Sequence, residues 1–137
     1  MSSRPRIERR TRPGQGVAVT AARLRNSFIK VGILSGTGEH PNATGGQTVA
    51  EVAWWNEFGT VRVDARPFLR TGLRENLREY RRIMRVFLPK VAQGQMTNVQ
   101  ALGILGAKAV SDVQAKMTAL GVLDSGQTRQ HINYQVL

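Results

Sequence analysis

Hydrophobic residues recur at helical spacing along two long segments in the second half of the chain. The first segment opens at Pro67, whose fixed φ suits a first helical turn, and continues to Pro89, where the proline kinks or ends the helix. The second segment can be capped by Thr97 and runs to Leu120 before Gly121 ends it. The apolar stripe of the first segment comprises Phe68, Leu69, Leu73, Leu77, Tyr80, Met84 and Leu88. Both segments are therefore predicted to be long amphipathic helices.

Two short stretches alternate between apolar and other residues, which predicts the strands of a small sheet. Residues 29–34 alternate in this way near the start of the chain, and residues 132–136 do so at its end. This spacing is typical of half-buried strands. Ahead of the second stretch, either Asp124 or Ser125 can cap a single helical turn.

One further helix is predicted over residues 48–58. Thr48 and Glu51 have the spacing of a capping box, and Gly59 suits the position just after the last turn. Residues 17–27 can form another short helix.

The chain is predicted to form one α+β domain preceded by a basic arm. Its 137 residues are enough for one domain with a core and too few for two ordinary ones. The domain spans residues 17–137 and has a small, mostly antiparallel sheet packed against long α-helices. Residues 1–16 hold too few apolar side chains to fold alone and are expected to be an extended N-terminal arm. Residues 35–47, rich in Gly, Thr and Asn, are expected to be a protruding connector.

A net charge of +11 and a pI of about 11.5 indicate a polyanionic neighbour, which can be DNA, RNA or an acidic protein surface. Because contacts between arginine and phosphate are largely independent of base sequence, the charge favours non-specific binding. The arm and the basic face of the first long helix either dock on such a partner or are solvated. The possible DNA or acidic-partner contacts are Arg4, Arg6, Arg9, Arg10 and Arg12 in the arm, and Arg74, Arg78, Arg81, Arg82 and Arg85 in the helix.

The sequence holds no residue pattern of an enzyme or a metal site. It has no cysteine, and its two histidines, His40 and His131, are far apart in the chain, which excludes the ordinary zinc and iron motifs. Glu75 and Glu79 are the only acids predicted to share a helical face, and their arginine neighbours favour ionised surface carboxylates over an acid–base pair. We therefore expect no catalytic residue, no cofactor and no metal. No apolar run is long enough to cross a membrane.

Four aromatic residues are candidates for packing and assembly. Trp54 and Trp55 are consecutive on the predicted helix and point in different directions, so at most one can lie fully on the core face. The other is expected at a rim or a subunit interface, where tryptophan is favoured. Phe58 and Phe68 are expected to anchor the core.

Two short segments, in this order along the chain, carry a resemblance to a known family. The first is residues 56–60 (NEFGT) running on to residues 66–70 (RPFLR), and the second is residues 123–127 (LDSGQ) running on to residues 132–134 (INY). They resemble the turn, cap and packing signatures of the small tail-completion proteins of tailed bacteriophages, which are also called head–tail joining or neck proteins. The resemblance covers residues 28–137.

This resemblance implies a structural virion protein of viral tail assembly and not an enzyme. Family members form a ring, expected here to be a hexamer or a dodecamer, that completes the tail or joins it to the portal complex of the head. The implied partners are further copies of the chain, portal and head-completion (adaptor) proteins, tail proteins and, non-specifically, the genomic DNA in the channel. The implied location is the neck of the virion, after assembly in the host cytoplasm and without a membrane.

The residues expected at the assembly interface are Trp54, Trp55, Glu57, Phe58, Arg66, Phe68 and Arg70, and of these Glu57, Arg66, Phe68 and Arg70 are expected to matter most for fold and assembly. Glu57 is expected to pair with Arg66 or with Arg70, either within one subunit or across to the next. Two other functions stay open. One is a tail-terminator ring of related architecture. The other is a non-specific nucleic-acid-binding protein without a ring, which explains the charge equally well but not the two segments.

Overall fold

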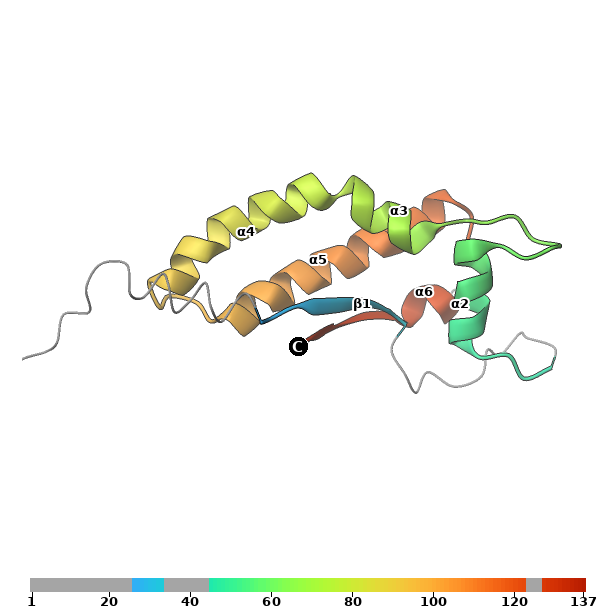
Figure 1. The fold of residues 1–137 in the computed structure, drawn as a ribbon, viewed down its shortest axis with the longest axis horizontal. Helices are drawn as coiled ribbons and strands as arrows, with labels where there is room; N and C mark the ends of the chain where they lie inside the picture. The colour runs from blue at the N-terminus through green and yellow to red at the C-terminus, as the bar shows by residue number, and fades with distance from the viewer. Residues whose placement is uncertain (1–25, 34–44, 123–126) are drawn as a thin grey trace, which may run out of the picture.

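The computed structural model describes residues 26–33, 45–122 and 127–137 (Figure 1). Within these ranges the chain forms two strands and five helices, in the order β1 (Ile29–Ile33), α2 (Val49–Phe58), α3 (Phe68–Glu75), α4 (Leu77–Ala92), α5 (Asn98–Ala119), α6 (Gln127–Gln130) and β2 (Ile132–Val136). The predicted α+β class is confirmed. The arm over residues 1–16, most of the predicted helix over 17–27 and of the connector over 35–47, and the candidate caps Asp124 and Ser125 lie outside the described residues.

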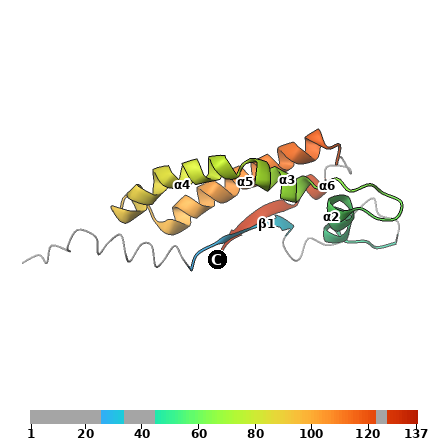
Figure 2. The same cartoon turned by 45° about the horizontal axis from the view of Figure 1, so that its top comes forward.

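The long helix α5 is the element on which the others are assembled. Figure 1 shows α4 antiparallel to α5 along one side, the two strands along the other, and α2 and α6 together at the end near α3. The view turned by 45° in Figure 2 shows the same neighbours. The core lies between α5, the sheet and the helices at that end, and its buried residues are Ala53, Phe68, Val113, Met117, Val122 and Ile132.

The sheet consists of β1 and β2 and is antiparallel, as predicted. Its register pairs Ile29 with Val136 and Ile33 with Ile132. Phe28 and Leu137 continue the ladder, because each donates its backbone N–H to the carbonyl of the other, at 2.9 and 2.7 Å. Along β2 the residues alternate between covered and exposed positions, which confirms the half-buried strand read from the sequence.

Helix ends follow the capping signals of the sequence. The hydroxyl of Thr48 accepts from the amide N–H of Glu51 at 3.2 Å, and the Glu51 carboxylate accepts from the amide N–H of Thr48 at 2.7 Å. Thr97 and Gln100 form an equivalent capping box at the start of α5. Gly121, at φ +70°, follows the last turn of α5, and the amides of Gly121 and Val122 donate back to the carbonyls of Thr118 and Met117.

The prediction of one helix from Pro67 to Pro89 is wrong, because two helices, α3 and α4, meet at Asn76. The side-chain Nδ2 of Asn76 donates to the carbonyl of Gly72 at 2.7 Å, and its backbone N–H donates to Leu73 at 3.2 Å. The side chain thus competes with the regular helical ladder. Pro89 neither ends nor breaks the second helix, since α4 continues to Ala92. Pro89 is exposed, so water can satisfy the carbonyl that a proline leaves free.

Two glycines set how closely other elements approach α5. A Cβ on Gly72 in α3 would lie 3.2 Å from the Cα of Val113. A Cβ on Gly106 in α5 would clash with the ring of Tyr134 on β2, where three ring carbons would lie within 2.9 Å. Helix α3 and strand β2 therefore pack closely on α5 because Gly72 and Gly106 have no side chain at the points of contact.

Candidate assembly surface around Glu57

The carboxylate of Glu57 joins the end of α2 to the start of α3. Glu57 is only 4% exposed. The carboxylate accepts the backbone N–H of Leu69 at 2.8 Å and of Arg70 at 3.0 Å, and the Nε of Arg70 at 2.8 Å. The two amides belong to the first turn of α3, whose N-cap Pro67 offers no side-chain hydrogen bond. Glu57 is therefore the acceptor that caps α3, where the helix dipole also favours a negative charge.

The ion-pair partner of Glu57 is Arg70, and it lies in the same subunit. Arg70 also donates from Nη2 to the Glu57 carbonyl at 3.2 Å. Arg66, the other candidate, contacts different groups: its backbone N–H donates to Asn56 at 2.6 Å, and its Nη1 donates to the Gly121 carbonyl at 3.0 Å. Arg66 therefore ties the α2–α3 connection to the carboxyl end of α5, where a cation is favoured.

Of the two phenylalanines expected in the core, Phe68 is buried and Phe58 is not. Phe68 is 2% exposed and Phe58 is 46% exposed, so the prediction for Phe58 is wrong. The buried positions of α2 are Val49, Val52, Ala53 and Glu57, which lie three to four residues apart on one face. Phe58 follows Glu57 directly and is rotated about 100° from that face. At this end of α2, the position that faces the core is occupied by Glu57 instead.

Phe58 instead forms a surface cluster with Trp54 and Arg70. The ring centroids of Trp54 and Phe58 are 4.3 Å apart. The guanidinium carbon of Arg70 lies over the Phe58 ring, 4.8 Å from its centroid, which is a cation–π distance. Trp54 is 63% exposed, and its neighbour Trp55 is exposed as well. Neither tryptophan lies on the core face, and the one in the cluster is the more exposed.

An open groove of about 360 Å³ lies beside this cluster. Its walls come from the end of β1, the start of β2, helix α2 and the first turn of α3. Most of the lining is apolar, and the polar side chains at its edge belong to Glu57 and Arg70. The apolar lining includes Ile33, Ala50, Ala53, Trp54, Phe58 and Leu69.

The α2–α3 connection is a tight turn that projects from the molecule at this end (Figure 1). Gly59 starts it at φ +77°, where a Cβ would come within 2.9 Å of the Ala65 nitrogen. The Thr60 N–H donates to the Val63 carbonyl at 2.8 Å, and the Thr60 hydroxyl accepts from the amide of Val63 at 3.0 Å. Although the backbone is held in this way, Val61 at the tip has a relative exposure of 106%.

The predicted basic face of the first long helix is divided between α3 and α4. Arg74 lies in the last turn of α3, and the other four described candidates lie on α4, where no residue is buried. All five are exposed. Arg82 pairs with Glu79 on the same helix, and this hydrogen bond is the main reason why the pKa of Glu79 is lowered. The arm residues Arg4, Arg6, Arg9, Arg10 and Arg12 lie outside the described residues.

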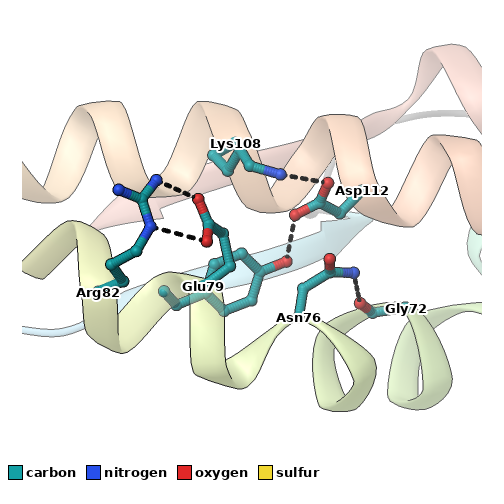
Figure 3. A network of polar contacts seen from close by, with 7 residues as sticks. Gly72, Asn76, Glu79, Arg82, Lys108 and Asp112 are labelled. Carbon is teal, nitrogen blue, oxygen red and sulfur yellow. Dashed lines mark hydrogen bonds and ion pairs between the residues drawn. The ribbon is translucent and has the colours of Figure 1, made fainter.

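A polar network holds α4 on α5 (Figure 3). Asp112 on α5 accepts the hydroxyl of Tyr80 at 2.9 Å and the ammonium of Lys108 at 2.7 Å. Burial, together with the bond to Asp112, raises the pKa of the Tyr80 hydroxyl well above its ordinary value. This contact fixes α4 against α5, while the arginines of α4 stay exposed. The sequence placed Tyr80 only on the apolar stripe of a helix and did not indicate that its hydroxyl would bond to Asp112.

Glu75 and Glu79 do not form the shared acidic face that one continuous helix would have given. They lie on α3 and α4, on either side of Asn76. Glu75 accepts Lys116 of α5 at 3.0 Å, whereas Glu79 accepts Arg82. Among the described residues, no group of three His, Cys, Asp or Glu could hold a metal ion.

In comparisons with known proteins, no family model, curated protein or solved structure matches the chain. Across the described ranges, no helix is long and apolar enough to cross a membrane. The function is therefore argued from the surface itself and from the resemblance of the two segments.

Proposed function

We propose that this protein is a structural subunit of the head–tail connector, or neck, of a tailed bacteriophage. It forms a ring that completes the tail or joins it to the portal complex, and DNA passes through the ring. In this role it catalyses no reaction. Its partners are other copies of the chain, the adaptor and tail proteins above and below it, and, without sequence preference, the DNA.

The observation that carries the proposal is the surface around Glu57. Residues 56–60 and 66–70, on which the resemblance rests, are joined by the buried Glu57 carboxylate and its three hydrogen bonds. The same contacts present Trp54, Phe58 and Arg70 at the surface. Exposed Trp, Phe and Arg side chains beside an apolar groove are typical of protein–protein interfaces and unusual for a monomer.

The exposed arginines of α4 support a second part of the proposal, which is the DNA channel. Helix α4 carries Arg78, Arg81, Arg82 and Arg85 along with one glutamate. A ring whose lumen is lined by such a helix would have a positive channel, which favours passage of DNA without reading its bases.

A non-specific nucleic-acid-binding protein that acts as a monomer is the second candidate, and the same arginines favour it. It leaves the exposed aromatic cluster and the groove without a role. A tail-terminator ring would use the same surfaces as a neck ring and differ in its partners.

Light scattering of the purified protein at low and high salt, with and without DNA, separates the two classes. A discrete oligomer that persists at high salt supports the ring. A monomer that binds DNA and loses it steeply with salt supports the monomeric DNA-binding protein and contradicts the ring.

A charge variant tests the channel separately. Arg81→Ala with Arg85→Ala should lower the salt dependence of DNA binding by the assembled ring by about one unit of slope per phosphate contact. Arg129→Ala, which removes an exposed arginine of α6, is the control. Equal slopes in all three proteins would refute the assignment of α4 to the channel.

A further inference from the structure

We propose that adjacent subunits are joined by insertion of the α2–α3 turn of one copy into the groove beside Trp54 and Phe58 of the next. This proposal rests on the proposed ring and names the contact that builds it. The turn consists of residues 59–65, and its apolar tip is formed by Val61 and Val63.

The turn has the properties of a preformed binding loop. Its backbone is held by the hydrogen bonds of Thr60 and by the left-handed Gly59. Val61 is nevertheless 106% exposed and Val63 is 45% exposed, so the ordered turn does not bury its tip in its own subunit. A loop that is ordered before binding loses little conformational entropy when it binds. The tip thus presents apolar side chains at low entropic cost.

The groove offers a matching surface. Its volume of about 360 Å³ lies within the range of about 300–1,000 Å³ typical of pockets that enclose a small group of atoms. Ile33, Ala53 and Leu69 supply apolar walls, and Trp54 and Phe58 form an aromatic rim. Two valine side chains are the kind of occupant that this lining favours.

The charged residues at the edges of the turn and of the groove are complementary, which supports insertion of the turn into the groove. Arg70 stands at the mouth of the groove with a side chain that is 52% exposed, although one side of it binds Glu57. Asp64 of the turn is exposed, and no salt bridge joins it to any described residue. Insertion of the tip would bring the Asp64 carboxylate of one copy toward the Arg70 guanidinium of the next.

The two surfaces also have the placement that a ring requires. None of residues 59–65 lines the groove of its own subunit. Figures 1 and 2 both show the α2–α3 connection projecting beyond α2. A contact between two different patches is heterologous, and repeating it closes a ring when the rotation per subunit allows. A twofold dimer could exchange the same two patches reciprocally, but it would stop at two copies.

Val61→Asp tests the contact, with Val99→Asp as the matched control. Val99 is an exposed valine in the first turn of α5 and lies outside both surfaces. We expect Val61→Asp to weaken self-association roughly tenfold or more, as loss of a central apolar contact does, while Val99→Asp assembles like the parent protein. Both variants should keep the melting temperature of the parent monomer.

Disulfide trapping identifies the two faces directly, because the chain has no cysteine of its own. Oxidation of a chain carrying both Val61→Cys and Ala50→Cys should give a ladder of covalent oligomers. Residues 50 and 58 are about 12 Å apart along α2, and the turn that carries residue 61 projects beyond α2 (Figures 1 and 2). A disulfide needs Cα atoms within about 7 Å, so a bond between subunits is expected and one within a subunit is not. The pair Val99→Cys with Ala50→Cys is the control and should give no ladder.

The outcomes separate this contact from the ring itself. Oligomers that persist in Val61→Asp, or a Val61–Ala50 pair that cross-links no more than its control, overturn the contact and leave the ring proposal standing. A parent protein that stays monomeric at every concentration and salt overturns both. Loss of assembly in Val61→Asp alone, together with the ladder, supports the contact.

Discussion

Replacement of Glu57 by alanine should destabilise the folded subunit more than any other single carboxylate change among the described residues. The substitution removes the acceptor of the Leu69 and Arg70 amides and of the Arg70 Nε. It also leaves the first turn of α3 without a side-chain cap, since Pro67 supplies none. We therefore expect the main effect on the stability of the subunit, with a loss of assembly as its consequence.

The size of the effect follows from these contacts. Loss of a helix N-cap costs about 0.5–2 kcal/mol, and a hydrogen bond to a charged group contributes about 1.5–3 kcal/mol. Arg70 is 52% exposed and can be solvated once its partner is gone, so its share is discounted. The three bonds act as one unit and do not add, which gives a total loss of about 2–4 kcal/mol. For a chain of this length, that corresponds to a fall in Tm of roughly 6–14 °C.

Urea unfolding followed by circular dichroism, with calorimetry, measures the loss. The control is Glu75→Ala, because Glu75 also accepts from a basic side chain but is 55% exposed and should cost less than about 1 kcal/mol. Glu57→Gln, which keeps the shape and one acceptor oxygen, should lie between alanine and the parent. If Glu57→Ala costs no more than Glu75→Ala, Glu57 is not the cap of α3 and the reasoning is refuted.

Three further changes test the packing and the polar contacts of the subunit. Gly106→Ala should cost about 1–3 kcal/mol in urea unfolding because its methyl would overlap an aromatic ring, whereas Gly103→Ala, with room for a methyl, should be neutral or stabilising; equal effects would contradict the close approach. The pKa of Tyr80 is raised in the folded protein, so its hydroxyl contributes its full share of the folding stability below the ordinary tyrosine pKa of about 10. This stabilisation is lost as the pH rises through the pKa of Tyr80 in the folded state. Absorbance titration should show a tyrosine that ionises late, and Tyr80→Phe should abolish that step and lower stability by about 0.5–1.5 kcal/mol at pH 7. Thr128→Val should be neutral or stabilising in thermal unfolding, because the buried hydroxyl has no hydrogen-bond partner in the described structure; a clear loss would reveal a partner.

Features that depend on neighbours in the chain were predictable. The capping boxes at Thr48 and Thr97 each join residues three apart, so the backbone conformation alone brings the partners together. The two strands follow from alternation, and Phe68 follows from its place on an apolar stripe. The same reasoning failed at Asn76, since a side chain that bonds a carbonyl four residues back can interrupt a helix whose apolar spacing is continuous.

The candidate site was predictable in its residues but not in its arrangement. Glu57 and its two possible arginine partners could be named from the sequence. Which arginine pairs with it depends on where α3 starts relative to the end of α2, and Arg66 is drawn instead to the carboxyl end of α5, 55 residues away. Phe58 was misassigned because hydrophobicity alone predicts that burial of the side chain is favourable. It does not predict which residue of the helix faces the core.

The sequence by itself determined the two strands, the capping boxes and the helices other than the break at Asn76, because these arise from contacts within one turn or from a fixed side-chain period. Only the tertiary structure decided that a carboxylate would be buried at Glu57 while Phe58 lies at the surface, and that Val61 would project at the tip of an ordered turn. The physical reason is that a buried charge is stable only where distant groups supply its hydrogen bonds. Here the first turn of α3 supplies them, and the side chains left outside form the surface through which the subunit is proposed to assemble.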